Sequence, residues 1–318
     1  MVDWTSNSAD TSVTKTGLSL TEGSTYYVSV RATDTDDQLS DTTTTDGVTI
    51  DVTAPVISSV SEGSTTSGSS NTHSLSFDGV DDGVDCGNDD SFDFGTGDFT
   101  VEAWINPANV SQNARIVARG NTNASGSYQL NITPNGQLRI SFYDDPGDYY
   151  SSNNVIQAET WQHLVLTRNG TAVKGYVNAE EIISFSNSSN LTSFQSLALG
   201  YEPTSSSYYS GLIDEVGIWN DALTASEVTA LYNSGTARDA RPNAGNYTSS
   251  SNLQGYWKMN EGTGTTVADA SGNSNTGTIS GASWNTDSPM GDGTKVNYAS
   301  GTGTTVLTFN YTVASGHN

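Results

Sequence analysis

The segment "GLIDEVGIWNDALTASEVTALYNSG", residues 211–235, decides the fold because it changes from a strand pattern to a helix pattern. Its first nine residues are a mostly apolar run of strand length. Thr224 and Glu227 then have the spacing of a helix capping box, and Val228 opens an apolar stripe at helical spacing. We therefore predict a strand over 211–219, followed by one short helix that lies across the end of a sheet.

Two adjacent acids, Asp214 and Glu215, interrupt this apolar run. Because side chains alternate along a strand, we expect the two carboxylates to point to opposite faces of the sheet. Asp214 then shares a face with Leu212, Val216 and other apolar side chains, where a buried charge needs a strong partner. A bound cation or several backbone N–H groups could be that partner, whereas Glu215 is expected to be a structural acid.

Composition excludes several classes of function. Lys and Arg total 11 against 35 Asp and Glu, a formal net charge of −24, so nucleic acid and anionic membranes would be repelled. Cys86 is the only cysteine, so no internal disulfide can form, and with three histidines any metal should be bound by oxygen. No apolar run approaches the roughly 20 residues of a membrane span, and the first residues lack an export signal. We expect a chain without membrane insertion.

The pattern along the whole chain is that of an all-β protein. Short alternating segments are separated by Gly, Ser, Thr and Asn, and the pair Asn169-Gly170 predicts a hairpin. The Ser-, Gly- and Thr-rich segment 58–72 has the composition of a linker. In the sequence before it, 1–57, the stretch "LTEGSTYYVSVRATD" has the alternation of a strand, and "DGVTIDVTAP" gives a second strand. These two stretches resemble the C-terminal part of a fibronectin type III-like domain. Residues 290–318 are predicted to open a further β-sandwich module, so the chain is interpreted as part of a longer tandem array.

Residues 73–289 carry four ordered motifs of one family. The motifs are "SLSFDGVDDGVDCGND", "FTVEAWINP", "WQHLVLTRNGTAVKGYVNAEEI" and the segment 211–235. In this order they resemble LamG-like domains of the concanavalin A-like lectin/glucanase superfamily. The resemblance implies a jelly-roll sandwich of two antiparallel sheets with one short helix. The later stretch "LQGYWKMNEGTG" could close this sandwich or only pack on it.

The sequence does not favour an enzyme. Laminarinase-type glucanases of the same superfamily carry E-x-D-x-E on one strand, because side chains two apart share a face. This triplet is absent from the sequence, and no G-x-S-x-G motif is present. We therefore predict a non-catalytic domain; a glucanase or polysaccharide lyase with a non-standard site is the alternative.

Calcium is the expected ion. In the family, an Asp of the corresponding late strand contributes to a structural Ca²⁺ site, which by resemblance gives Asp214 that role. The loop "DASGNSN" places Asp269 and Asn275 among further oxygen donors, with a plain Asx-rich turn as the alternative. Asp78 could join a cation or cap a turn, and its neighbours Asp81 and Asp82 are expected to be exposed.

Two aromatic loops, "YDDPGDYYSSNN" and "YEPTSSSYYSG", have the composition of a sugar site. Tyr209 is expected to pack inside the domain. The candidate ligand-binding residues of these loops are Tyr149, Tyr150, Tyr208, Asp145 and Asp148.

Together these patterns predict a calcium-stabilised carbohydrate-binding or adhesion module of a large secreted or cell-surface protein. Its partners would be a glycan or cell-surface polysaccharide and the neighbouring β-sandwich modules. A structural spacer or protein-contact domain without sugar binding is the alternative.

Overall fold

The computed structural model describes residues 24–27, 29–30, 43–44, 48–49, 71–120, 124–143, 148–202, 207–290, 298–300 and 308–309. The chain divides into two units, one spanning Thr66–Thr294 and the other comprising Met1–Thr65 and Lys295–Asn318. Most of the predicted linker 58–72 lies outside the described residues, and the predicted domain boundaries stay predictions.

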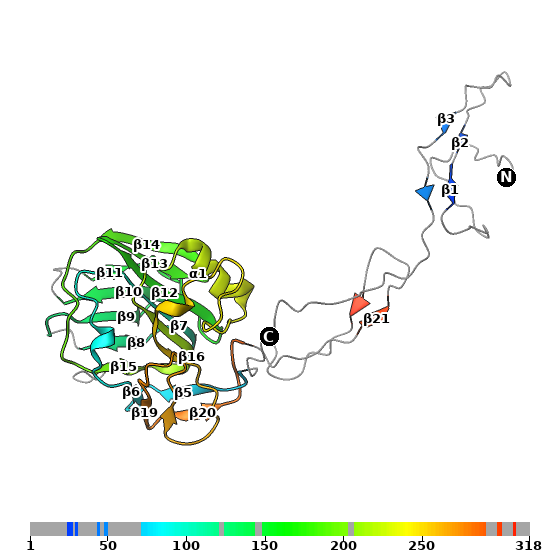
Figure 1. The fold of residues 1–318 in the computed structure, drawn as a ribbon. Helices are drawn as coiled ribbons and strands as arrows, with labels where there is room; N and C mark the ends of the chain where they lie inside the picture. The colour runs from blue at the N-terminus through cyan, green and yellow to red at the C-terminus, as the bar shows by residue number, and fades with distance from the viewer. Residues whose placement is uncertain are drawn as a thin grey trace. The chain divides into compact units, whose positions relative to one another are not determined.

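The larger unit is a sandwich of two antiparallel sheets, as predicted (Figure 1). In the first sheet the strand order is β14 (Glu180–Ser186), β13 (Ala172–Val177), β12 (Gln162–Asn169), β7 (Phe99–Pro107), β16 (Ser210–Trp219), β5 (Ser74–Asp78) and β20 (Ser283–Asn285), and β17 (Leu253–Trp257) also pairs with β16. In the second sheet the order is β11 (Tyr149–Tyr150), β10 (Gln137–Phe142), β9 (Tyr128–Thr133), β8 (Ala114–Arg119), β15 (Leu197–Leu199), β6 (Gly83–Asp85), β19 (Gly277–Ser280) and β18 (Thr266–Val267).

The stretch after the helix closes this same sandwich. Strand β17 pairs with β16, and β20 pairs with β5 in the first sheet. Strand β19 pairs with β6 in the second sheet. Segments on both sides of the helix therefore contribute to each sheet, which settles the alternative that the sequence left open.

The main core lies between the sheets. Along β7 the predicted alternation is confirmed: Phe99, Val101, Ala103 and Ile105 all belong to the buried cluster between the sheets. The second sheet contributes the alternate apolar residues of β8, β9 and β10 to the same cluster. Each sheet thus turns one side inward, and its remaining side chains point to an outer face.

Helix α1 (Ala225–Tyr232) covers the outer face of the first sheet, not the end of a sheet as predicted. The predicted capping box is present, and the helix ends at Asn233, which adopts a left-handed conformation with φ 46°. Its apolar stripe packs with Trp219 and Tyr247 in a second buried cluster. The outer face of the first sheet beneath α1, which includes Trp104, Glu102 and Trp219, is called the covered face below.

A buried hydrogen-bonded pair of titratable side chains lies on the covered face. His163 Nε2 and Glu102 Oε2 are 2.9 Å apart, and both side chains are at most 2% exposed. The rings of Trp104 and Tyr232 stack with the His163 ring. Burial raises the pKa of Glu102, and its hydrogen bond with His163 opposes that shift. The covered face therefore buries this pair completely, and His163 Nδ1 has no hydrogen-bond partner there.

Turns and short helices connect the strands of the sandwich. The hairpin predicted at Asn169-Gly170 is confirmed, with Gly170 and Thr171 in the turn between paired Asn169 and Ala172. At the sheet edge, Lys174 Nζ lies 2.7 Å from Glu181 Oε2 on β14. Three 3-10 helices span Asp90–Phe92, Asn233–Gly235 and Ser250–Asn252.

The other unit contains short strand pairs. In it β1 (Thr25–Tyr26) pairs with β4 (Val48–Thr49), β2 (Ser29–Val30) with β3 (Thr43–Thr44), and β21 (Tyr298–Ser300) with β22 (Thr308–Phe309). The fibronectin type III-like segment and the further sandwich module stay predictions. Among the described residues, no helix has the length and apolar character needed to cross a membrane.

Candidate functional site

A β-bulge in β16 brings Asp214 and Glu215 together. Asp214 pairs with Trp104 and Gly217 pairs with Glu102. A step of three residues along β16 therefore corresponds to a step of two residues along β7. Glu215 adopts φ 46° within this bulge. The predicted separation of the two carboxylates onto opposite faces is therefore wrong, because an extra residue in left-handed conformation breaks the alternation.

Both carboxylates converge on the side-chain amide of Asn71. Asn71 Nδ2 lies 2.9 Å and 3.0 Å from the two Asp214 carboxylate oxygens and 2.8 Å from Glu215 Oε1. The same nitrogen also contacts the carbonyl oxygen of Lys258. An amide nitrogen carries two hydrogens, so four oxygens surround a group that can satisfy only two of them.

The charge of this cluster is poorly compensated. Asp214 and Glu215 are 0% and 1% exposed. Burial, followed by the charge of Glu215, raises the pKa of Asp214 well above its usual value, and burial raises the pKa of Glu215 to about 8. The hydroxyl of Tyr256 donates to Glu215, and that of Ser288 donates to Asp214. Two carboxylates and a carbonyl, all oxygen donors, fit the ligand preference of Ca²⁺.

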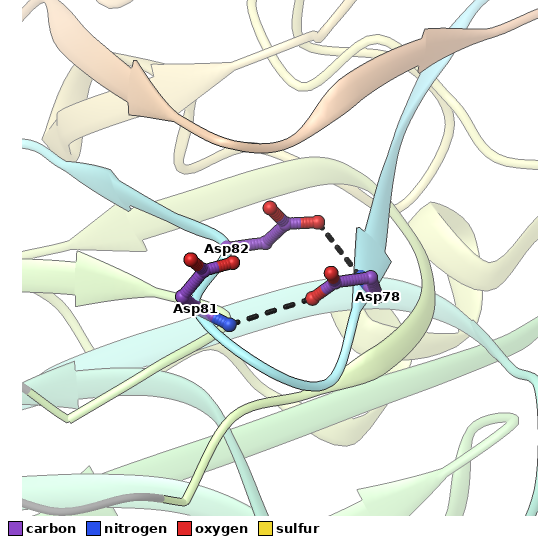
Figure 2. Close-up of side chains that lie close together, drawn as sticks. All are labelled: Asp78, Asp81 and Asp82. Carbon is purple, nitrogen blue, oxygen red and sulfur yellow. Dashed lines mark hydrogen bonds between the residues drawn. The ribbon is translucent and has the colours of Figure 1, made fainter.

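A second acidic cluster lies in the turn between β5 and β6 (Figure 2). Asp78, Asp81 and Asp82 each place a carboxylate oxygen within 4.8 Å of the others. Asp78 caps the turn by accepting from the backbone N–H groups of Val80 and Asp81. Asp82 is 6% exposed and accepts from the N–H of Asp78, so the expectation that Asp82 is exposed is wrong. The turn folds its carboxylate inward, and burial raises its pKa.

The loop 269–275 is held by hydrogen bonds to its own backbone and to β17. Asp269 Oδ1 accepts from the N–H groups of Tyr256 and Ser271, and Oδ2 accepts from that of Asn275. The Asn275 carbonyl accepts from Trp257 Nε1. These bonds are those of an Asx-rich turn, and a cation at Asp269 and Asn275 stays a prediction.

A row of polar side chains crosses the outer face of the second sheet. Register pairs Arg115 of β8 with Asn131 of β9, Asn131 with Arg139 of β10, and Arg139 with Tyr150 of β11. Their chain neighbours face the core, so these four point away from it. We call these four residues the polar row. With strands about 4.8 Å apart, it spans about 14 Å.

The polar row contains buried atoms without hydrogen-bond partners. Arg139 and Asn131 are 8% and 0% exposed. Nε and Nη2 of Arg139 and Oδ1 of Asn131 have no partner. By contrast, Nε and Nη2 of Arg115 both lie 2.8 Å from Glu202 Oε2. Unmatched buried polar atoms are uncommon in folded proteins and indicate a place for a ligand or water.

The predicted ligand-binding residues fall in different places. Tyr150 is 48% exposed at the end of the polar row, and its hydroxyl donates to Asp148, which also lies 3.5 Å from Arg139 Nη1. Tyr149 instead packs against the core and stacks on Phe185. Asp145 lies outside the described residues.

Tyr208 stacks on Tyr201, with ring centroids 6.2 Å apart. The Tyr201 ring lies over Gly83, where a Cβ atom would come within 2.3 Å of it. Gly83 neighbours core residue Val84, so this aromatic pair shares the outer face with the polar row. Tyr209 is fully buried, as predicted.

Three residues of the polar row were not predicted: Arg115, Asn131 and Arg139. A signal for two of them was present in the sequence. The stretches "YQLNIT" and "QLRISF" alternate polar residues with Leu and Ile, which indicates a polar outer face on consecutive strands.

The family of the larger unit follows from its sequence. Residues 77–229 match the laminin G profile of the concanavalin A-like lectin/glucanases superfamily. These residues form a concanavalin A-like domain. The predicted family and the all-β sandwich are thereby confirmed. No curated protein matches the sequence.

Comparison with solved structures found several that are similar to this chain. A candidate carbohydrate-binding protein from Bacteroides ovatus aligns with a TM-score of 0.52 and 17% identity, covering 84% of this chain and 70% of that one. A pentraxin from Limulus polyphemus gives 0.40 and 15%, with 51% and 82% covered. The CBM40 of a Ruminococcus gnavus sialidase, bound to α2,3-sialyllactose, gives 0.39 and 15%, with 44% and 84% covered.

Proposed function

We propose that the concanavalin A-like domain is a non-catalytic carbohydrate-binding module of a secreted or cell-surface protein, with the polar row as its ligand face. The observation that carries this proposal is the set of unmatched buried atoms on Arg139 and Asn131 beside the exposed ring of Tyr150. The shared fold with the candidate carbohydrate-binding protein of Bacteroides ovatus supports it.

The chemistry of the row suits a sugar. Sugar hydroxyls both donate and accept hydrogen bonds, so they can match the donors of Arg139 and the acceptor of Asn131. An exposed tyrosine offers an apolar ring with a polar tip, which suits the C–H face of a pyranose. Tyr150 lies directly beside Arg139 in register, so one ligand can contact both.

A glycan array probed with the 318-residue chain tests the proposal. We expect bound glycans whose affinity falls at least tenfold in Tyr150→Ala. Phe194→Ala removes an aromatic ring that is 91% exposed outside the polar row and should leave binding unchanged, so it is the matched control. An array without hits would contradict the proposal and favour a spacer. Product release from polysaccharides would contradict the non-catalytic assignment.

We further propose that Ca²⁺ stabilises the domain at the bulge in β16. Asp214, Glu215 and the Lys258 carbonyl would hold the ion, and Asn71 could offer its amide oxygen. The four oxygens around one amide nitrogen support this location. Bound calcium would also neutralise the two buried carboxylates, whose charge burial disfavours.

Melting curves in EDTA and in Ca²⁺ test this metal site. An ion that binds only the folded state adds about 2.7 kcal/mol at a concentration 100 times its Kd, so Ca²⁺ should raise the melting temperature. Asp214→Asn should abolish that increase, whereas Asp78→Asn, in the other acidic cluster, should preserve it. An unchanged midpoint in wild type would contradict calcium binding, and loss of the increase only in Asp78→Asn would place the ion in the β5–β6 turn.

A further inference from the structure

Two arginines of the polar row differ in how their guanidinium edges are used. In Arg115 the edge formed by Nε and Nη2 is filled by one carboxylate oxygen of Glu202, at 2.8 Å from both nitrogens. In Arg139 the same two nitrogens are buried and have no partner. Arg139 forms an ion pair through its third nitrogen, Nη1, which lies 3.5 Å from Asp148 Oδ2.

The unfilled edge has a defined chemical complement. Nε–H and Nη2–H lie in one plane and point the same way, which matches the two oxygens of a carboxylate. The domain uses that edge for a carboxylate at Arg115, on the same face two strands away. The charge of Arg139 is partly balanced by Asp148 at Nη1, but a single neutral hydroxyl oxygen would not provide the two matching oxygens that the Nε–Nη2 edge accommodates.

We infer that the ligand is an acidic glycan, whose sugar carboxylate binds the Nε–Nη2 edge of Arg139 while Asn131 and Tyr150 contact the adjoining hydroxyls and ring. This inference rests on the proposed function and names the class of its ligand. The formal net charge of −24 opposes densely charged polymers. The carboxylates of the ligand should therefore be separated by neutral sugars or stand at a chain end.

The solvent-exposed part of the row lies at its β11 end. Exposure of the Arg139 side chain is 10%, and the neighbouring Tyr150 is 48% exposed. Asp148, at the same end, holds the Tyr150 hydroxyl at 3.0 Å. A sugar that stacks on Tyr150 would lie beside Arg139 in register, and its carboxylate would have to enter from there to reach the buried Nε–Nη2 edge.

Matched pairs of glycans test the inference on the unaltered chain. The probes are oligogalacturonate, hyaluronan oligosaccharide and sialyllactose, each beside its carboxyl-reduced form, with neutral xylan, arabinan and β-glucan and one sulfated galactan. We expect at least one acidic probe to bind at least tenfold more tightly than its reduced form. Equal binding of the two forms, or binding of neutral or sulfated glycans alone, would overturn the inference and leave the proposed function standing. No binding to any probe would contradict both.

Variants of Arg139 then locate the contact. Arg139→Lys keeps the positive charge but removes the planar edge, so it should reduce affinity for the acidic probe at least tenfold and leave the weaker affinity for its reduced form unchanged. Arg241→Lys, at an exposed arginine outside the row, is the matched control and should bind as wild type. Equal losses for the acidic and reduced probes in Arg139→Lys would indicate damage to the face and overturn the carboxylate contact.

Discussion

The two sheets of the sandwich have similar inner faces and very different outer faces. On the covered face, helix α1 packs with the rings of Trp219 and Tyr247, and the Glu102–His163 pair is fully buried, although His163 Nδ1 has no hydrogen-bond partner. On the outer face of the second sheet, the polar row leaves buried donors and an acceptor unmatched beside an exposed tyrosine. The comparison separates two uses of a sheet face: the first stabilises the domain, and the second is the face that we propose binds a ligand.

The largest expected effect is that of Trp219→Ala on the covered face. Trp219 is fully buried and its Nε1 donates to the hydroxyl of Tyr247, so removal of the ring should lower the free energy of unfolding by about 3–5 kcal/mol. Tyr150→Ala in the polar row should change it by about 0.5 kcal/mol or less. Urea unfolding of both variants measures the difference. Equal losses of unfolding free energy would show that the two outer faces contribute alike to stability.

A smaller effect comes from adding one methyl group beneath a ring on each face. A Cβ atom at Gly217 would lie 2.4 Å from the buried Trp219 ring, and one at Gly83 would lie 2.3 Å from Tyr201. Gly217→Ala should cost about 1–3 kcal/mol because Trp219 cannot move aside. Gly83→Ala should cost less, because Tyr201 is partly exposed and can rotate.

Thermal unfolding and glycan binding together check this pair of variants. We expect Gly217→Ala to lower the melting temperature and leave glycan affinity unchanged. Gly83→Ala should alter the affinity more than the stability, because its added methyl group displaces Tyr201 and Tyr208 on the ligand side. A larger loss of stability in Gly83→Ala than in Gly217→Ala would show that side chains on the outer face of the second sheet are packed at least as tightly as those on the covered face.

The smallest effect is a pH dependence from Glu102 on the covered face. Burial raises the pKa of this carboxyl above its usual 4.5, so the folded state keeps a proton that the unfolded state has lost. The stability that the Glu102 proton contributes is fully present below pH 4.5 and is lost as the pH rises through the folded-state pKa. Over that range the free energy of unfolding should fall by at most about 1.4 kcal/mol per pH unit. Glu102→Gln carries no titrating proton and should remove the share of the slope that Glu102 contributes, while the raised pKa values of Asp214 and Glu215 leave a slope of the same sign.

Urea unfolding measured from about pH 4 to pH 8 records that slope. Glu181→Gln is the control, since Glu181 is partly exposed in an ion pair at the sheet edge and should leave the profile nearly unchanged. A wild-type slope that persists undiminished in Glu102→Gln would assign the dependence to other groups.

Local patterns predicted much of the fold. The capping box at Thr224 and Glu227 and the hairpin at Asn169-Gly170 depend on neighbours in the sequence, and both were found. The position of α1 was mispredicted because it depends on which sheet face offers apolar side chains. The burial of Asp82 depends likewise on how its turn folds back.

The candidate site was less predictable, for two physical reasons. The bulge at Glu215 is set by the register between β16 and β7, which strand alternation alone does not contain. The polar row joins residues from four strands, so Arg139 and Asn131 become neighbours only when the sheet forms. Tyr150 and Asp148 were predicted to bind a ligand because aromatic and acidic residues gather in one short segment, and that role stays a prediction.

The edges of the two sheets affect whether copies of this domain aggregate at high local concentration. The second sheet ends in two-residue strands, β11 and β18, and the edge strand β14 of the first sheet begins with Glu180 and Glu181. Short or charged edges offer a poor template for a strand from another molecule. Crowded copies should therefore resist edge-to-edge aggregation, and β14 is the place where removal of charge would first permit it.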